Sequence, residues 1–210
     1  RLDRGSDRGD GHAVVSSALK LSPSVWVYDA KTESPALRPG QLAIAHTPGA
    51  AFGDGRHPTT RLCAGAVDLW VRSRQPKRVL DVGTGTGILA RIAWHRGVRH
   101  IVATDIDPVA LASAEAHFRL DGASGIALSD ESPDHWGAVF DLVVANILLA
   151  PLCQLAPALA ASLDANGTLM VSGLLRSQAP ALRVELQAQG LRFGSEAFLD
   201  DWVLLVFSKG

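Results

Sequence analysis

Hydrophobic and polar positions follow two alternating patterns from residue 78 onward. Short, continuous apolar runs are typical of strands buried on both faces, and they occur at residues 78–82, 100–106, 125–129, 141–147 and 167–173. Amphipathic patterns with helical spacing separate these runs, at residues 87–97, 108–122, 148–163 and 177–190. The alternation predicts a doubly wound α/β fold with a mostly parallel sheet.

The end of the chain departs from this alternation. Two strand-like runs, residues 191–199 and 202–210, are separated by little more than a turn, so no crossover helix fits between them. We therefore expect an antiparallel strand at the C-terminal end of a seven-stranded sheet. In the helix before them, a leucine stripe is expected to face the core, with Pro157 as a possible irregularity; it comprises Leu148, Leu152, Leu155, Leu159 and Leu163.

The first part of the chain has a different pattern. Residues 1–11 are charged, contain glycine and lack periodicity, which indicates a mobile end. Residues 24–30 and 41–46 have the composition of short strands, and residues 58–74 form an amphipathic helix with Pro58 at its first position. We therefore divide the chain into residues 1–50, a mobile end with a short β linker, and residues 51–210, the α/β domain.

Composition and charge narrow the class of protein. A formal net charge of −1 over 210 residues provides no global basic field, so we do not expect a nucleic-acid binder. No apolar run approaches the ~20 residues of a membrane span, and we expect no membrane partner and a cytoplasmic location. Cys63 and Cys153 lack the spacing of a metal site. The chain begins with arginine and its single methionine is Met170, so we expect the natural start to lie upstream.

A glycine-rich turn follows the first parallel strand. The stretch "LDVGTGTG" places Gly83 and Gly85 where the backbone can turn tightly and a ligand can approach the next helix. The spacing is GxGxG instead of the dinucleotide fingerprint GxGxxG, and Asp81 precedes it. A carboxylate suits a ligand with an amine and a sulfonium better than a pyrophosphate. Asp105 ends the next strand, where a carboxylate binds ribose hydroxyls. These features favour S-adenosylmethionine over NAD.

Several motifs then carry a family resemblance. "DVGTGTGILA", "ATDIDPVAL" and "VVANIL" resemble the first motifs of class I S-adenosylmethionine-dependent methyltransferases, which have a Rossmann-like fold. "AFGDGRHPTT", "VVANILLAPLCQLAP" and the late "DDW" together resemble the ribosomal protein L11 methyltransferase family. The likeness extends from about Trp26 to the C-terminus. It implies an enzyme that methylates lysine and N-terminal amines of a ribosomal protein and releases S-adenosylhomocysteine.

The resemblance also implies site residues. The cofactor-binding positions are expected at Phe52, His57, Thr60, Asp81, Gly83, Thr84, Gly85, Asp105, Ile106, Ser129 and Asn146, and the catalytic positions at Asn146, Ile147 and Thr59. Threonine hydroxyls and free N–H groups at a helix start can hold the methionine carboxylate. The Asn146 side-chain oxygen, with the backbone carbonyl beside it, can orient a substrate amine. No general base is required, because the methyl donor is already activated.

Some assignments stay open. Ser129 and Asp130 lie where adenine is usually held, whereas Trp202 matches a family tryptophan but suits core packing equally well. We interpret His57 as a helix N-cap or a hydrogen-bonding support in preference to a base.

Two departures from the family leave the substrate open. Asp54 replaces the usual threonine, and about fifty residues before the loop leave no room for the family's N-terminal docking domain. The substrate is therefore an amine-bearing protein, peptide or small molecule. The alternatives are an O- or C-methyltransferase acting on small molecules and a non-catalytic cofactor-binding module.

Overall fold

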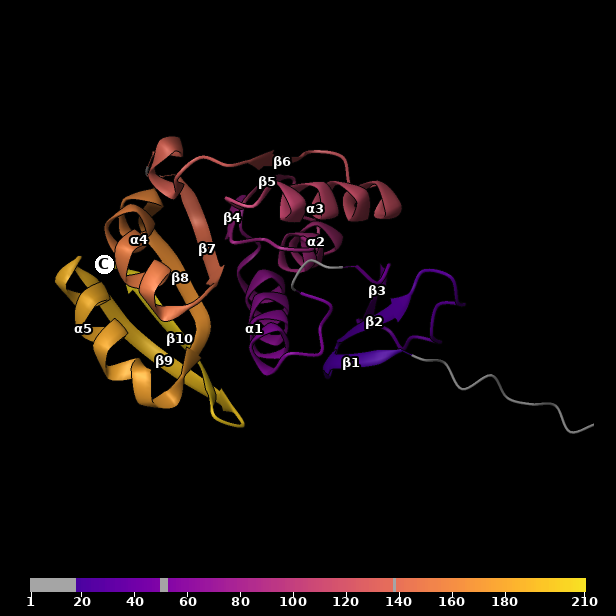
Figure 1. Cartoon of the computed structure of the whole chain (residues 1–210), viewed down its shortest axis with the longest axis horizontal. Helices are drawn as coiled ribbons and strands as arrows, with labels where there is room; N and C mark the ends of the chain where they lie inside the picture. Colours follow the sequence, from indigo (N-terminus) through magenta and orange to yellow (C-terminus); the bar gives the residue numbers. More distant parts are fainter. Residues whose placement is uncertain (1–17, 50–52, 138) are drawn as a thin grey trace, which may run out of the picture.

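The computed structural model describes residues 18–49, 53–137 and 139–210. Its main feature is a seven-stranded sheet with the order β6-β5-β4-β7-β8-β10-β9 (Figure 1). The strands are β4 (Arg78–Val82), β5 (His100–Thr104), β6 (Ile126–Ser129), β7 (Phe140–Asn146), β8 (Leu163–Leu175), β9 (Leu191–Leu199) and β10 (Trp202–Lys209). The pairs that β10 forms with β8 and β9 are antiparallel and the other neighbouring pairs of this sheet are parallel, which confirms the predicted fold class.

The order of the strands creates a switch point at β4. The chain moves from β4 outward through β5 to β6 and then returns to place β7 on the other side of β4. In such sheets, the connections from adjacent strands diverge at the carboxyl ends and leave a crevice for a ligand. The glycine-rich turn after β4 and the asparagine that ends β7 therefore share one edge of the sheet.

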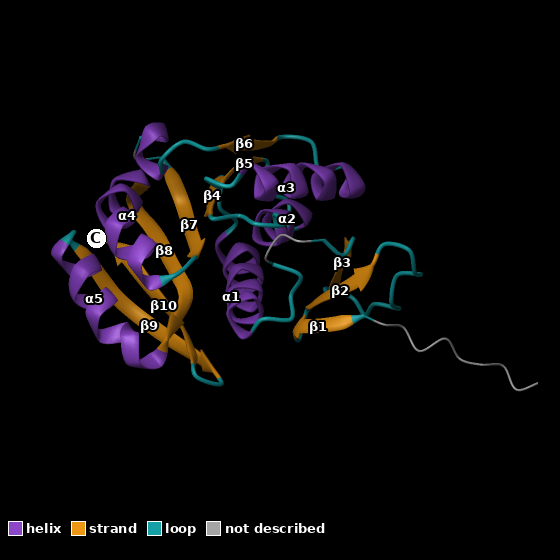
Figure 2. Ribbon diagram, viewed as in Figure 1, coloured by secondary structure: helices purple, strands orange, loops and turns teal. Residues whose placement is uncertain are grey.

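Helices cover both faces of the sheet (Figure 2). One face carries α1 (Pro58–Arg74), α2 (Ile88–His95) and α3 (Pro108–Asp121), and the other carries α4 (Leu149–Ser162) and α5 (Ala179–Ala188). Within β4, Val79 belongs to the first apolar cluster and Leu80 to the second, because successive side chains point to opposite faces. Short 3₁₀ turns occupy Pro133–Trp136 and Arg176–Gln178.

The N-terminal strands form a second, three-stranded sheet. Its order is β1 (Leu19–Ser22), β2 (Val25–Asp29) and β3 (Leu42–His46), and the strand β1 was not predicted. Leu21, Val25 and Ile44 are buried in the same cluster as α1 and α2. The predicted boundary at residue 50 lies outside the described residues, as do residues 1–11, so the domain division stays a prediction.

A buried ion pair fastens this small sheet to the main body. Arg91 of α2 is fully buried and pairs with Asp121, its Nε lying 2.6 Å from the carboxylate. The same guanidinium donates to the backbone carbonyl of Ala45 in β3. Because a buried charge must be paired and hydrogen-bonded, the position of β3 relative to α2 is well defined.

The leucine stripe predicted for residues 148–163 is only partly correct. Leu152 and Leu159 are fully buried in α4, but the side chain of Leu148 is 69% exposed because this residue precedes the helix. Pro157 lies inside α4 without ending it. Cys63 and Cys153 are free thiols. None of the described helices is long and apolar enough to span a membrane.

Candidate active site

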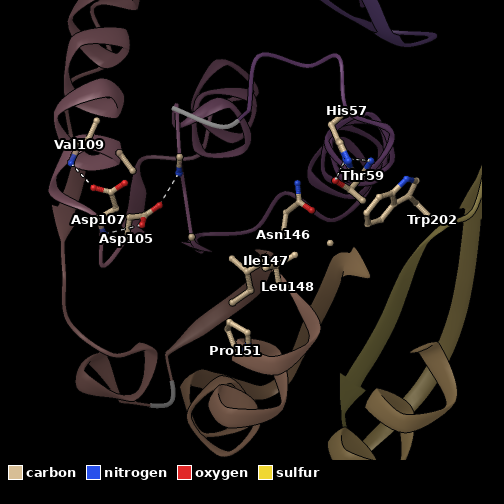
Figure 3. A pocket seen from close by; sticks show the side chains of 14 residues that line it. His57, Thr59, Asp105, Asp107, Val109, Asn146, Ile147, Leu148, Pro151 and Trp202 are labelled. Carbon is tan, nitrogen blue, oxygen red and sulfur yellow. Dashed lines mark hydrogen bonds between the residues drawn. The ribbon is translucent and has the colours of Figure 1, made fainter. Parts of the chain in front are cut away.

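The switch point of the sheet holds a cavity of about 510 Å³ (Figure 3). Its walls come from the turn after β4, the ends of β5 and β7, and the N-terminal ends of α1, α3 and α4. The lining residues are His57, Thr59, Gly83, Gly85, Asp105, Asp107, Val109, Ala110, Asn146, Ile147, Leu148, Pro151, Gly173 and Trp202. The volume and the mixture of apolar walls with a few polar groups are typical of a small-molecule site.

The glycine-rich turn leaves space that any side chain would fill. Gly83 adopts a left-handed backbone with φ +70°, and a Cβ built there would lie 2.1 Å from Cγ2 of Ile147. The backbone N–H groups of Gly83 and Thr84 both donate to the carbonyl of Thr104, at 2.8 and 2.9 Å. The turn is therefore fixed to β5, and its open side faces the cavity.

Asp81 supports this turn from below. Its Oδ2 accepts hydrogen bonds from the Thr84 hydroxyl at 2.7 Å and from the Ala90 N–H, in the first turn of α2, at 3.1 Å. Its Oδ1 has no hydrogen-bond partner among the described residues. Burial raises the pKa of Asp81 to about 6, because desolvation disfavours the charged carboxylate. Asp81 thus joins the glycine turn to a helix N-terminus.

Asp105 is oriented by two backbone groups. Oδ2 accepts from the Gly85 N–H at 3.0 Å and Oδ1 from the Asp107 N–H at 3.1 Å (Figure 3). Each carboxylate oxygen has a further lone pair available for a ligand hydroxyl. Asp107 caps α3 by accepting from the Val109 N–H at 2.8 Å, as expected for an aspartate before a proline at the first helical position.

His57 and Thr59 form the start of α1 at the cavity wall. His57 is the N-cap, and its Nδ1 accepts from the Thr59 N–H at 3.3 Å and lies 2.8 Å from the Thr59 hydroxyl. The prediction of an N-cap is therefore confirmed. The imidazole also meets the edge of the Trp202 indole, with ring centroids 4.5 Å apart. Trp202 is part of the cavity wall and also pairs with Leu199 in the β9–β10 hairpin, so both of its interpretations stay open.

Asp54 does not line this cavity. Its Oδ1 accepts from the Arg56 N–H at 2.9 Å, and its Oδ2 lies 3.7 Å from the exposed Arg56 guanidinium. It borders a separate depression beside β2 and β3. The charge that distinguishes this loop from the family pattern therefore lies outside the candidate site.

Asn146 ends β7 and lines the cavity, near the start of α1 in Figure 3. Its Oδ1 is buried and has no hydrogen-bond partner among the described residues. A buried carbonyl oxygen without a partner carries a desolvation penalty of about 1–3 kcal/mol, which a ligand donor would relieve. The next carbonyl, that of Ile147, lies so close to Gly173 that a Cβ there would be 2.2 Å from the oxygen. Gly173 has φ +93°, so a side chain is also disfavoured by the backbone.

The structure brings together many of the residues indicated by the sequence. Those that line the cavity are His57, Thr59, Gly83, Gly85, Asp105, Asn146 and Ile147, whereas Ile106 and Asp130 line an adjoining cavity of about 290 Å³. Thr60, Asp81, Thr84 and Ser129 lie outside both linings, and Phe52 lies outside the described residues. The Ser129 hydroxyl accepts a hydrogen bond of 3.1 Å from the Glu131 N–H.

Sequence reasoning did not assign six of the lining residues to the site, namely Asp107, Val109, Ala110, Leu148, Pro151 and Gly173. Gly173 had a usable signal, since it lies near the carboxyl end of β8, which runs parallel to β7 and reaches the same edge. Across the part of the chain that the structure describes, no three His, Cys, Asp or Glu side chains are grouped to hold a metal ion.

The fold and the site define a protein with the Rossmann-like fold of class I methyltransferases, with a glycine turn and a strand-end aspartate at the switch point. Comparison with known proteins identifies the family within this class. The family model for ribosomal protein L11 methyltransferase matches residues 17–210. The chain therefore belongs to the ribosomal protein L11 methyltransferase family.

Individual relatives support this membership. The ribosomal protein L11 methyltransferases of Rhizobium etli and Chromohalobacter salexigens are each 38% identical to it, over 82% and 88% of this chain. The crystal structure of a ribosomal protein L11 methylase from Lactobacillus delbrueckii subsp. bulgaricus superposes with a TM-score of 0.82 at 32% identity. It covers 91% of this chain and 98% of that one. The chain spans 61% of the length of the Rhizobium and Chromohalobacter relatives.

Proposed function

We propose that this chain is an S-adenosylmethionine-dependent N-methyltransferase that acts on amine groups of a protein, with ribosomal protein L11 as the first candidate substrate. The observation that carries the proposal is the buried Oδ1 of Asn146, which has no partner among the described residues and lies in a cavity walled by the glycine turn. An acceptor in that position suits an amine donor. A ribosomal substrate implies that the protein acts in the cytoplasm.

The described residues fit the proposed cofactor. Gly83 provides a cradle that a Cβ would close, and Asp105 offers two oriented carboxylate oxygens for ribose hydroxyls. Ile106 and Asp130 border the adjoining cavity, where the adenine would lie. The start of α1, with Thr59 and Thr60, would hold the methionine carboxylate through the helix N-terminus. When bound, the cofactor supplies a methyl group that its sulfonium has already activated.

The protein's task is then to position a neutral amine and exclude water. Asn146 Oδ1 would accept a hydrogen bond from the substrate amine and thereby set the direction of its lone pair, with the Ile147 carbonyl and the Thr59 hydroxyl as neighbours. Val109, Leu148 and Pro151 form apolar parts of the wall, which a bound cofactor and substrate would cover and thereby remove from water. Trp202 lines the cavity beside His57 and offers an aromatic surface to the aliphatic part of the substrate.

The decisive test incubates the protein with isotope-labelled S-adenosylmethionine and purified ribosomal protein L11, with methylated positions located by mass spectrometry. We expect label on lysine or N-terminal amines. Transfer to another protein's amine but not to L11 would contradict the substrate, and transfer only to oxygen or carbon would contradict N-methylation. Cofactor binding without transfer to any acceptor would support a non-catalytic module.

Asn146→Ala tests the proposed acceptor. We expect turnover to fall about 100-fold while the melting-temperature shift produced by S-adenosylhomocysteine is retained, because orientation and not cofactor binding is lost. Asn166→Ala, which removes an exposed asparagine in β8, is the matched control and should turn over normally. Normal turnover by Asn146→Ala would refute the assigned role.

A further inference from the structure

The short loop of residues 53–57 is held between two parts of the protein. It leads into α1 and carries His57 at the cavity wall. Both of its glycines have left-handed backbones, with φ +109° at Gly53 and φ +88° at Gly55. Each glycine faces a different neighbour, so the two positions have separate physical reasons.

Gly53 contacts the glycine turn of the cavity. The Thr86 hydroxyl donates a hydrogen bond of 2.8 Å to the Gly53 carbonyl, and the Thr86 side chain is 2% exposed. A Cβ at Gly53 would lie 2.8 Å from that hydroxyl oxygen. This hydrogen bond joins two segments that are 33 residues apart in the sequence.

Gly55 contacts the three-stranded sheet on the other side. A Cβ built at Gly55 would lie 2.6 Å from Cδ2 of Leu21, a β1 residue whose side chain is 4% exposed. The loop therefore has the glycine turn on one side and β1 on the other. Since Leu21 belongs to the shared core, this side of the loop rests on a fixed surface.

The two threonines of the glycine turn have different partners. The Thr84 hydroxyl donates to Asp81 beneath the turn, whereas the Thr86 hydroxyl donates to the loop. A threonine in such a turn is usually considered as a ligand contact. Here the donor of Thr86 is used within the protein, so its influence on a ligand must pass through the loop.

We infer that Thr86 is a positioning residue, whose hydrogen bond to Gly53 sets the distance between the start of α1 and the glycine turn. His57 and Thr59 line one wall of the cavity, and Gly83 and Gly85 line another. Without the hydrogen bond, residues 53–57 lose one of the contacts that hold them, so the spacing of the two walls becomes less well defined. The consequence for binding rests on the proposed function of the cavity, whereas the consequence for the loop does not.

The test compares Thr86→Val, which keeps the shape but removes the donor, with Thr86→Ser, which keeps the donor. Thr32→Val is the matched control, because the Thr32 hydroxyl also donates to a backbone carbonyl at 2.8 Å, in an exposed turn. Calorimetry measures the Kd for S-adenosylhomocysteine. Hydrogen exchange of residues 53–60 in the cofactor-free protein reports the loop itself.

We expect Thr86→Val to raise the Kd and the KM for the cofactor about tenfold, with a smaller change in kcat. The loop amides of this variant should exchange about tenfold faster. Thr86→Ser should stay within about twofold of the wild type in every readout, and Thr32→Val should be unchanged.

Unaltered loop exchange and cofactor affinity in Thr86→Val would overturn the inference, as would equal losses in Thr86→Ser. If the wild type does not bind S-adenosylhomocysteine, the proposed function fails. The exchange comparison then still tests whether Thr86 positions the loop.

Discussion

Asp81→Asn is expected to make the cofactor-free protein more stable and the cofactor complex weaker. The Asp81 side chain is 1% exposed, and its charged form is disfavoured by desolvation. An asparagine keeps one acceptor oxygen for the Thr84 hydroxyl and the Ala90 N–H, and it removes the buried charge. The carboxylate is thus a cost to folding. Asp81 does not line the cavity, but its negative charge lies behind the glycine turn and would favour the cationic cofactor of the proposed function.

The size of this effect follows from proton linkage. Folding raises the pKa of Asp81 from its ordinary value of 3.8 to about 6. At about 1.4 kcal/mol per pKa unit, the charged carboxylate costs about 3 kcal/mol. Between these two pKa values the folded state holds the proton more tightly than the unfolded state. Wild-type stability therefore falls as pH rises through this window, and the cost is fully present above pH 6.

Urea denaturation of both proteins from pH 4 to pH 7.5 measures the difference in unfolding free energy. Contributions from other titrating groups, and any cost of the amide that does not depend on pH, cancel in the pH dependence of that difference. We expect the variant to gain most of the ~3 kcal/mol across this range, while its Kd for S-adenosylmethionine rises about tenfold. A difference that is flat with pH, or that changes in the opposite direction, would refute the argument.

Two further predictions concern the fold around the site. In thermal denaturation, Gly83→Ala should lower the melting temperature by several degrees more than Gly122→Ala. Both glycines have positive φ, but only at Gly83 would a Cβ meet another side chain. Equal shifts would contradict this steric argument. Burial and the neighbouring His117 lower the pKa of His46 to about 4, so wild-type stability falls as pH drops from 6.5 toward 4. His46→Phe keeps the stacking on His117. In urea titrations over that pH range, its unfolding free energy should fall by up to about 3 kcal/mol less than that of the wild type. An equal fall in both proteins would exclude His46 as the cause.

Periodicity predicted the sheet well for a physical reason. A strand buried on both faces must be apolar throughout, and a helix that covers it must be apolar on one side. The hydrophobic pattern of residues 78–210 therefore indicates which segments are strands and which are helices. The glycine turn, Asp105 and Asn146 were predictable because they follow such strands, and the carboxyl ends of parallel strands converge at one edge. The sequence could therefore predict those parts of the site that the sheet topology alone brings together.

The strand β1 shows where this reasoning fails. Only four residues form it, and its burial comes from the contact with α1 and the loop, not from a repeated pattern in the sequence. Leu148 shows the opposite error, because helical spacing suggested a buried residue where the helix had not yet begun. Boundaries and short edge elements depend on tertiary contacts that a local pattern does not contain.

Glycines in motifs are readily attributed to ligand contact. Four glycines of this chain show two different reasons for the absence of a side chain: close approach at the cavity and packing against protein neighbours outside it. Gly83 and Gly173 lack side chains because Ile147 approaches them at the cavity, so a larger residue would displace a wall of the site. Gly53 and Gly55 are confined by Thr86 and Leu21, which are protein neighbours outside the cavity lining. Substitution at the first pair should therefore alter the cavity directly, whereas substitution at the second pair should act through the position of α1. Asp54 stands between the second pair, and its carboxylate interacts with Arg56 at a separate depression, which explains how the chain tolerates a charge at this position.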